Sequence, residues 1–318
     1  MRYNNNMKQH RDRPGIRRQK RKERGVPEMA SQLTKGLYEK HGVQYATLTL
    51  QDGGCALTVT PEKGGMATSF TKSGEEYLWL RDGNFESTDR PRCGIPILFP
   101  NCGRPDGGVH HFEGGDYPME IHGFADLVPW QVAEATDDAI VLTLTPNGLT
   151  KFVYPFEFQL FMRYTLTGNR AELSLTVKNN GDMPMPFSFG FHPYFAASAL
   201  ENVDFDIQAA TCSEDAKGPQ PAAPAKLTLT RKPGAADSIR LLTGVQSPMV
   251  FTDGGNGHWV TVDFDNHFGN GVLWQQDAEH FVCMEPWNGW ANSVNEEGRH
   301  EELAPGASLT ACWGITIE

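Results

Sequence analysis

This sequence of 318 residues lacks any apolar run near the roughly 20 residues that a transmembrane helix requires. Its N-terminus also lacks the apolar stretch that a secretory signal peptide contains. We therefore expect a cytoplasmic protein with no membrane partner. Nothing in the sequence decides between a monomer and a dimer.

Cysteines spaced as C-x-x-C are missing too, which argues against a structural zinc site. In a chain of this length, scattered cysteines indicate buried thiols in a reducing compartment rather than a disulfide framework. The six cysteines are Cys55, Cys93, Cys102, Cys212, Cys283 and Cys312.

Signatures of nucleotide binding are equally absent, since the sequence contains no P-loop and no dinucleotide fingerprint. The nucleophile elbow of a hydrolase is missing as well. The net charge is −11, although ten of the 28 Lys and Arg residues lie within residues 1–28, so the remainder is strongly acidic. An acidic surface repels phosphates, which argues against nucleic acid as a partner.

Residues 1–30 form a basic segment with almost no apolar side chains. Because such a segment cannot bury a core, we predict a disordered tail. The simplest interpretation is a solvated extension, or sequence that precedes a start at Met29. A basic binding arm or a targeting segment is the alternative.

From Tyr45 onward, short runs of β-branched and aromatic residues are separated by Gly, Asn, Asp and Pro. Alternation on both sides of Asp52-Gly53-Gly54 indicates a β-hairpin. The best candidate for a helix is the short segment 31–42. Many strands, few helices and no fixed repeat predict an all-β protein. Residues 31–318 would form a single catalytic domain, a large antiparallel β-sandwich.

Polar groups interrupt the alternating pattern in four apolar or Gly/Pro-rich segments, and Glu285 stands out among them. We interpret VCMEP as a strand that ends in this carboxylate, because Pro286 holds the preceding residue extended and stops the ladder. Trp287 and Trp290 follow, and aromatic faces beside a carboxylate suit the binding of a sugar. The alternative is a structural Glu paired with an Arg at a sheet edge.

His192 shares this local design, since it ends the aromatic run FSFGF and precedes Pro193. Alone, it would more often be a packed core histidine. Two titratable groups that are both fixed before a proline favour a rigid acid and base for proton transfer. A neighbouring carboxylate would favour the imidazolium, whereas aromatic packing would disfavour it.

Three further residues are candidates for substrate binding. Arg92 and Arg104 flank the run IPILFP, and each offers donors for sugar hydroxyls, for a phosphate or for a carboxylate. His122 precedes a glycine that permits an unusual turn. The loose cluster of His110, His111, Glu120 and His122 is the alternative, a metal site, but its spacing fits no tight ligand rule.

The four segments together resemble the aldose 1-epimerase family, also called galactose mutarotase-like proteins. The resemblance extends from about Gln44 to the C-terminus. It is carried by CGIPILFPNCGR, HGFADLVPW, NNGDMPMPFSFGFHPYF and VCMEPWNGWANSVNEEGRHEELAPGASLTACWGI. It implies a β-sandwich with a sugar site in a concave face, the interconversion of α and β anomers, and no cofactor or metal.

The resemblance also implies roles for single residues. His192 would be the general acid on the ring oxygen and Glu285 the general base on the C1 hydroxyl, while Arg104 and His122 would hold the sugar. A non-catalytic carbohydrate-binding protein would need neither proton donor nor acceptor. A glycosidase is disfavoured, because it normally uses two carboxylates.

The sequence departs from the family pattern at two places. Many relatives read HGFAR, and here Asp126 replaces that Arg, which would weaken the binding of a hexose phosphate. Arg92 does match an Arg of the phosphate-using branch, so hexose and hexose phosphate both stay open as substrates. Relatives also supply an Asp between the His and Glu motifs, for which Asp253 and Asp277 are the candidates.

Overall fold

The computed structural model describes residues 31–213, 220–221, 237–276 and 279–318. The basic segment 1–30 and the candidate Asp277 lie outside the described residues. Among the described residues, no helix has the length and apolar character that a membrane crossing requires.

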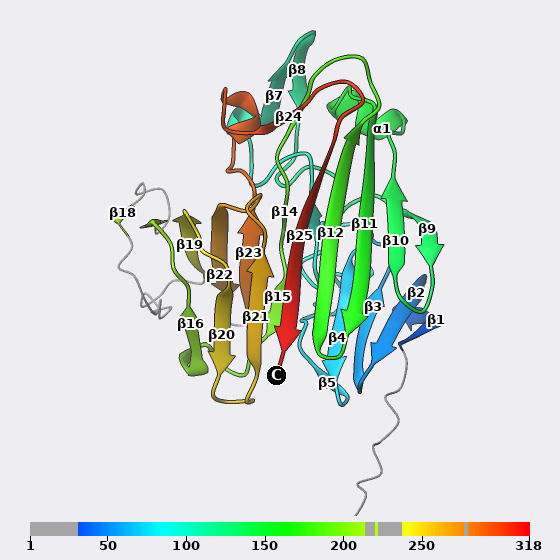
Figure 1. The fold of residues 1–318 in the computed structure, drawn as a ribbon, viewed down its shortest axis with the longest axis vertical. Helices are drawn as coiled ribbons and strands as arrows, with labels where there is room; N and C mark the ends of the chain where they lie inside the picture. Colours follow the sequence, from blue (N-terminus) through cyan, green and yellow to red (C-terminus); the bar gives the residue numbers. More distant parts are fainter. Residues whose placement is uncertain (1–30, 214–219, 222–236, 277–278) are drawn as a thin grey trace, which may run out of the picture.

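Two large antiparallel sheets form most of the molecule and confirm the all-β prediction (Figure 1). The first sheet carries eight strands, and its long members lie at the front of Figure 1. Its strands, in spatial order, are β16 (Val203–Asp206), β20 (Met249–Asp253), β21 (Trp259–Phe264), β25 (Ser308–Ile317), β12 (Arg170–Asn179), β11 (Phe158–Thr167), β10 (Ile140–Leu144) and β9 (Gln131–Ala135).

The second large sheet, here called the site sheet, also has eight strands. Its order is β18 (Gln220–Pro221), β17 (Thr211–Ser213), β19 (Asp237–Thr243), β22 (Asn270–Gln276), β23 (Phe281–Trp287), β14 (Gly190–Phe191) and β6 (Ile97–Leu98), with β15 (Tyr194–Ala196) also beside β23. Strand β23 therefore has β22 on one edge and the interrupted pair β14 and β15 on the other.

Smaller elements complete the fold. A five-stranded sheet runs in sequence order through β1 (Gln32–Lys40), β2 (Val43–Asp52), β3 (Cys55–Val59), β4 (Ala67–Lys72) and β5 (Glu75–Glu76). Two strand pairs are β7 (Val109–Phe112) with β8 (Gly115–Pro118), and β13 (Met185–Phe187) with β24 (Glu301–Leu303). The helical elements among the described residues are α1 (Gly148–Val153) and the 3-10 turns Asp106–Gly108, Leu200–Asn202 and Ser293–Asn295.

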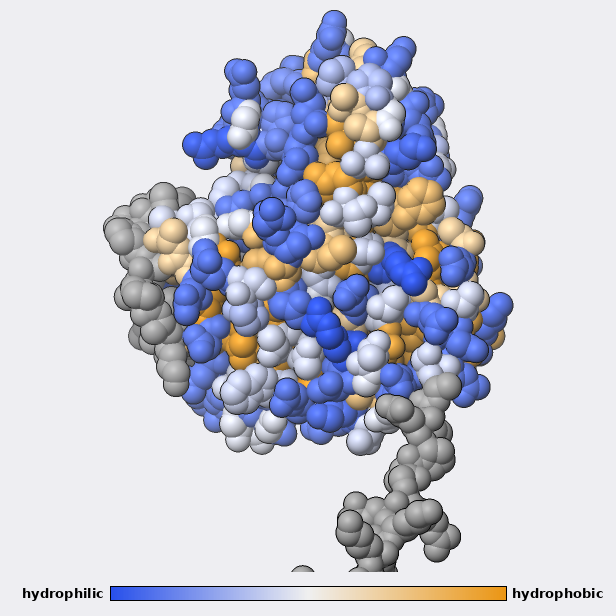
Figure 2. All heavy atoms as spheres, in the orientation of Figure 1, coloured by the Kyte–Doolittle hydropathy of each residue, from blue (hydrophilic) through white to orange (hydrophobic). Residues whose placement is uncertain are grey.

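The main core lies between the first sheet and the site sheet. The ring of Phe191 in β14 packs on Trp313 in β25 with centroids 4.7 Å apart, and Phe195 in β15 packs on Phe251 in β20 at 5.4 Å. The opposite face of the first sheet is only partly buried, as the alternating burial along β11 shows. Figure 2 shows that the visible surface is largely hydrophilic, with small separate hydrophobic areas.

The period of two along a strand explains how residues 187–195 combine a core with a site. Phe191 and Phe195 point into the core between the sheets, and all their ring atoms are buried. The residues between them alternate to the other face, where His192 and Tyr194 stack with ring centroids 4.5 Å apart. The aromatic run is therefore a core wall on one face and a site wall on the other.

One prediction of local structure was confirmed and another was wrong. Strand β2 ends at Asp52 and β3 begins at Cys55, as the hairpin signal at Asp52-Gly53-Gly54 predicted. The segment 31–42 is not a helix, because β1 pairs with β2 along its whole length. His41 and Gly42, with φ of 51° and 81°, form the tight turn that permits this pairing, so tertiary pairing overrides a weak helical propensity.

Candidate active site

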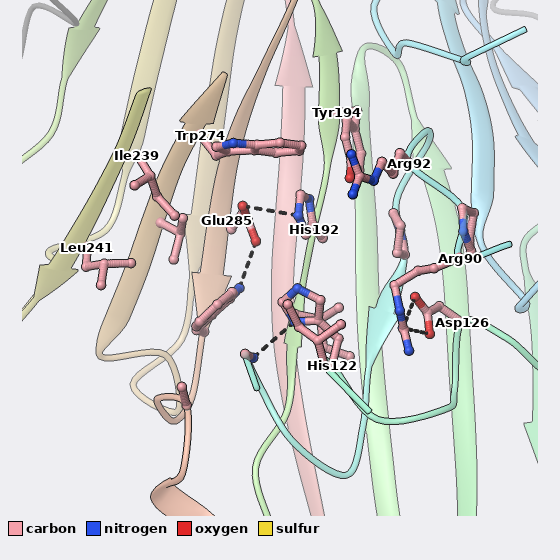
Figure 3. A pocket seen from close by; sticks show the side chains of 18 of the residues that line it. Arg90, Arg92, His122, Asp126, His192, Tyr194, Ile239, Leu241, Trp274 and Glu285 are labelled. Carbon is pink, nitrogen blue, oxygen red and sulfur yellow. Dashed lines mark hydrogen bonds and ion pairs between the residues drawn. The ribbon is translucent and has the colours of Figure 1, made fainter. Parts of the chain in front are cut away.

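A pocket of about 350 Å³ lies on the face of the site sheet that points away from the core (Figure 3). This volume lies at the lower end of the range of small-molecule sites. Its lining includes four of the five residues singled out in the sequence, namely Arg92, His122, His192 and Glu285. The motifs around residues 90–104, 122–126, 192–194 and 285–291 therefore converge on one cavity, although they are far apart in the chain.

Strand register places His192 and Glu285 beside each other. Gly190 lies opposite Trp287, and Tyr194 lies opposite Cys283. His192 lies midway between Gly190 and Tyr194, and Glu285 lies midway between Cys283 and Trp287 on the facing strand β23. Both side chains therefore share one face of the sheet. The His192 Nε2 atom is 3.5 Å from Glu285 Oε1, and Figure 3 shows the two side chains facing each other.

Pro286 does not end the strand as the sequence analysis predicted. Strand β23 continues through Pro286 to Trp287, with Gly271 of β22 opposite the proline. The register sets the break between β14 and β15 beside this part of the strand. A residue that lacks an N–H group is tolerated there, because the neighbouring ladder is itself interrupted.

Burial dominates the electrostatics of the pair, since Glu285 is 1% exposed and His192 is 9% exposed. Burial raises the pKa of Glu285 well above its usual value, and the N–H of Trp287 opposes this by donating to Oε2 over 3.0 Å. Burial also lowers the pKa of His192 to about 3. The pocket without a ligand therefore favours a pair that holds a single proton, on the carboxyl group, beside a neutral imidazole.

The imidazole of His192 is held in position by its surroundings. Its backbone N–H donates to the Pro96 carbonyl over 3.0 Å, its ring stacks on Tyr194, and the edge of Trp274 packs against it with centroids 5.7 Å apart. The Nδ1 atom is buried without a hydrogen-bond partner among the described residues. Glu285 is thus the polar group within reach of this ring.

His122 presents a defined nitrogen to the pocket. The backbone N–H of Gly103 donates to His122 Nδ1 over 3.0 Å, so Nδ1 is an acceptor and Nε2 carries the hydrogen. Burial lowers the pKa of His122 well below its usual value, with the nearby His192 as the next cause, so the ring is a neutral donor. Its left-handed backbone, with φ of 65°, bends the chain so that the ring turns toward His192 at 5.5 Å.

The neighbouring glycine is required by the close approach of two chains. Gly123 has φ of 73°, and a Cβ atom there would lie 2.2 Å from the Phe99 carbonyl oxygen. The expectation that this His-Gly pair forms an unusual turn is therefore confirmed.

Arg90 and Asp126 form a second buried feature of the pocket wall. One guanidinium nitrogen of Arg90 contacts both carboxylate oxygens of Asp126, and the other donates to the Gly123 carbonyl over 2.8 Å. Asp126 is 1% exposed, and burial raises its pKa to about 6 despite the opposing effect of Arg90. Arg92 lines the pocket beside this pair and has an exposed side chain.

Two candidate residues lie elsewhere. Arg104 does not line the pocket; it is largely exposed and lies 3.7 Å from Glu120 on the surface. Asp253 is buried outside the pocket, where it accepts hydrogen bonds from the backbone and hydroxyl of Ser198 and from the Gly255 N–H. It stabilises a turn, so it does not complete this site.

Sequence reasoning missed Arg90, Tyr194, Trp274 and the hydrogen bond from Trp287 to Glu285. Tyr194 could have been found from alternation, because it lies two residues from His192 on the same face. Trp287 was predicted as a sugar-binding aromatic residue, but its hydrogen bond to Glu285 was not. Trp274 reaches the site through cross-strand pairing with Cys283, which a single sequence does not reveal.

The structure does not bring the loose histidine cluster, the alternative considered from the sequence, together as a group of ligand atoms. His110 is buried in β7, whereas His111 pairs with Asp116 on the surface. Among the described residues, two other groups have ligand atoms within 4.8 Å of one another: His192 with Cys283 and Glu285, and His41 with Asp82 and Glu86. Burial raises the pKa of both Cys283 and Glu285, which opposes the deprotonated state that metal ligands need.

The six cysteines all lie among the described residues, and no disulfide joins any two of them. Cys55, Cys93, Cys102 and Cys283 are buried as expected, whereas Cys212 and Cys312 are partly exposed.

Comparison with known proteins agrees with this architecture. The sequence model of the family described as aldose 1-epimerase matches residues 46–311. The chain belongs to the aldose 1-epimerase family. Membership places it among sugar epimerases, and the resemblance of its four motifs to this family is confirmed.

Several known proteins resemble the chain along most of its length. The chromosomal LacX protein of Lactococcus lactis is 27% identical over 268 residues, which cover 76% of this chain and 87% of LacX. The Slr1438 protein of Synechocystis has a structure with 28% identity and a TM-score of 0.81, covering 88% of this chain and 98% of its own. A galactose 1-epimerase of Lactobacillus acidophilus, 18% identical with a TM-score of 0.71 and coverage of 91% and 98%, shares the fold.

Proposed function

We propose that this aldose 1-epimerase family member interconverts the α and β anomers of a hexose by acid–base ring opening, with Glu285 as base and His192 as acid. The observation that carries the proposal is the 3.5 Å contact between His192 Nε2 and Glu285 Oε1 inside the pocket. Proton transfer at two neighbouring sugar oxygens needs an acid and a base at such a fixed short separation.

In the proposed reaction, ionised Glu285 removes the proton of the C1 hydroxyl while protonated His192 donates its proton to the ring oxygen. The C1–O5 bond breaks, and C1 becomes the aldehyde carbon. Rotation about C1–C2 then presents the other face of the carbonyl. Ring closure reverses both proton transfers, so no covalent intermediate forms and the enzyme returns to its starting state.

The pair carries one proton throughout this cycle. Ring opening converts the ion pair of Glu285 and His192 into the neutral pair, which is the form that burial favours in the empty pocket. A proton shift across the 3.5 Å contact would form the ion pair from the neutral pair of the empty pocket without exchange with solvent, and ring closure restores the same ion pair. Trp287 supports the carboxylate, and the Tyr194 ring face supports the imidazolium.

The other polar groups would bind hydroxyls. His122 offers its Nε2–H to the sugar, because Nδ1 already accepts from Gly103. Arg92 is a donor fork at the rim. The aromatic rings of Trp274, Trp287 and Trp290 offer faces for sugar C–H groups.

The test is anomer exchange of freshly dissolved α-glucose and α-galactose, followed by polarimetry or NMR. Positioned acid–base groups contribute roughly 10²–10⁴-fold each. We therefore expect His192→Ala and Glu285→Gln each to lose at least about 100-fold in kcat. Retention of the accelerated rate by both variants would overturn the assignment. Binding of a sugar without any acceleration would instead favour a carbohydrate-binding protein.

A hexose phosphate is the second candidate substrate. A protein of Cenchrus ciliaris that is provisionally named a glucose-6-phosphate 1-epimerase is 31% identical over 155 residues, 44% of each chain. The presence of Arg90 and Arg92 in the pocket favours an anion, whereas the contact of Asp126 with Arg90 offsets one of these charges. Glucose 6-phosphate therefore belongs in the same assay.

A further inference from the structure

The pocket has chemically different ends on the two sides of the His192–Glu285 pair. In Figure 3, Arg90, Arg92 and Asp126 lie on one side of the pair, and Ile239 and Leu241 lie on the other. A free hexose carries hydroxyls around its whole ring, so it would match the polar end but not the opposite one. The apolar end therefore favours a sugar that carries an apolar group there in place of a hydroxyl.

Strand register fixes the position of the apolar end. Glu285 of β23 lies opposite Val272 of β22, which in turn lies opposite Leu241 of β19. Side chains that are opposite each other in antiparallel strands share a face and have Cβ atoms about 5 Å apart. Val272 is thus about 5 Å from Glu285 along the sheet, and Leu241 is about 10 Å from it.

We define the apolar shelf as Ile239, Leu241 and Val272, which all line the pocket. The shelf packs with Leu98, Trp287 and Trp290 in one hydrophobic cluster. Aliphatic side chains provide no partner for a hydroxyl, and a buried hydroxyl without a partner weakens binding. Among the described lining residues on this side, Trp274 offers an indole N–H that lies toward Ile239 in Figure 3.

The proposed reaction orients the sugar relative to the shelf. With the ring oxygen at His192 and the C1 hydroxyl at Glu285, the direction from His192 to Glu285 runs from O5 past C1 to O1, and C2 is the ring neighbour of C1 on the side away from O5. In the orientation that we infer, the substituent at C2 lies over Val272, one strand beyond Glu285. A substituent at C5, on the other side of the ring oxygen, lies toward the polar end instead.

From this arrangement we infer that the pocket is built for an aldose whose C2 carries an acetamido group in place of a hydroxyl. The methyl group packs on the apolar shelf, and the carbonyl oxygen accepts from the indole N–H of Trp274. The polar groups on the opposite side hold the hydroxyls of the ring. This inference rests on the proposed function for the orientation of the sugar, and it adds the substrate class.

The experiment compares four sugars at equal concentration: glucose, N-acetylglucosamine, 2-deoxyglucose and 6-deoxygalactose. Each catalysed rate is divided by the uncatalysed rate of the same sugar, because the substituents also change the spontaneous reaction. One apolar group in a hydrophobic pocket discriminates about 10–200-fold. We expect kcat/KM for N-acetylglucosamine to exceed that for glucose by at least about tenfold, whereas 6-deoxygalactose gains no such advantage.

Two variants test the shelf itself. Val272→Thr keeps the shape of the side chain but places a hydroxyl beside the C2 position, so the preference for N-acetylglucosamine over glucose should fall about tenfold. Leu241→Asn tests the same contact one strand further from Glu285. The matched control is Val132→Thr on the exposed edge strand β9, which should leave the preference unchanged. Thermal unfolding of each variant verifies that it is folded.

The outcomes separate this inference from the proposed function. Glucose turned over as well as N-acetylglucosamine would overturn the inference while leaving the mutarotase function intact. A preference for 2-deoxyglucose alone would also overturn it, because the acetamido group would then have no contact. If no sugar is accelerated, the proposed function fails, and titration calorimetry of glucose against N-acetylglucosamine still decides which of the two the pocket prefers.

Discussion

Replacement of Trp287 by Phe isolates the hydrogen bond that supports the proposed base. The indole N–H donates to Glu285 Oε2 over 3.0 Å, and the residue is buried. Phe keeps an aromatic ring in the packing against Trp290 but removes the donor. The ionised carboxylate therefore loses stabilisation, whereas the protonated carboxyl loses little.

The magnitude follows from the charge on the acceptor. A hydrogen bond to a charged group contributes about 1.5–3 kcal/mol, and its loss raises the pKa of Glu285 further. Since each 1.36 kcal/mol changes a rate tenfold, kcat should fall about 10–100-fold. The pH above which activity is lost should move upward, because the shared proton is held more tightly.

The assay is polarimetry of freshly dissolved α-glucose over a range of pH, with kcat and KM determined separately. Trp290→Phe is the matched control, because Trp290 also lines the pocket and packs on Trp287, yet no hydrogen bond joins it to Glu285. If both variants lose the same amount of kcat and neither shifts the pH profile, the loss reflects packing. The role given to the indole N–H would then be refuted.

Three further predictions concern charge. Burial lowers the pKa of His192 to about 3 and so opposes the binding of a second proton by the pair. Burial also raises the pKa of Glu285 and so opposes the loss of the last proton. The catalysed rate, corrected for the spontaneous reaction, should thus stay level through neutral pH, and an acid limb near the free-histidine pKa of about 6.5 would contradict this. Because the folded-state pKa of Glu285 exceeds its unfolded value, its bound proton stabilises the fold at low pH, and this contribution is lost as pH rises through the folded pKa. Glu285→Gln should accordingly gain melting temperature relative to the wild type between pH 5 and pH 9, as measured by thermal unfolding, and a constant difference would speak against it. Asp126→Asn should release Arg90 and lower KM for glucose 6-phosphate about tenfold, with charge-assisted hydrogen bonds as the source. The control Asp263→Asn removes the partner of Arg170 on the first sheet and should leave that KM unchanged.

The β architecture was accessible from the sequence because its signals are local. Period-two alternation and turn residues identify strands such as β11 and β12 without any knowledge of their partners. The helix predicted at 31–42 was wrong for the opposite reason. Its strand β1 is mostly exposed and gains its structure from pairing with β2, so its own residues carry little β signal.

The site was predicted to the extent that motifs specify it. His122, His192 and Glu285 line one pocket, and the separation of His192 and Glu285 depends on a register between strands almost a hundred residues apart. Arg104 lies outside this pocket and contacts Glu120 at the surface, a placement that its motif alone does not specify. Arg90 lines the pocket instead, where it contacts Asp126, and no spacing rule suggests this contact.

The register that sets His192 opposite Glu285 also makes the site sensitive to changes in length. Deletion of one residue between Phe281 and Glu285 would shift the strand by one position and turn every later side chain to the other face. The carboxylate would then enter the core, and Pro286 would take its position facing the pocket. Point substitutions in β23 adjust the chemistry, whereas insertions and deletions there abolish it together with the core. We therefore expect changes in chain length to be tolerated in the loops between strands, whereas engineering of β23 must conserve the residue count.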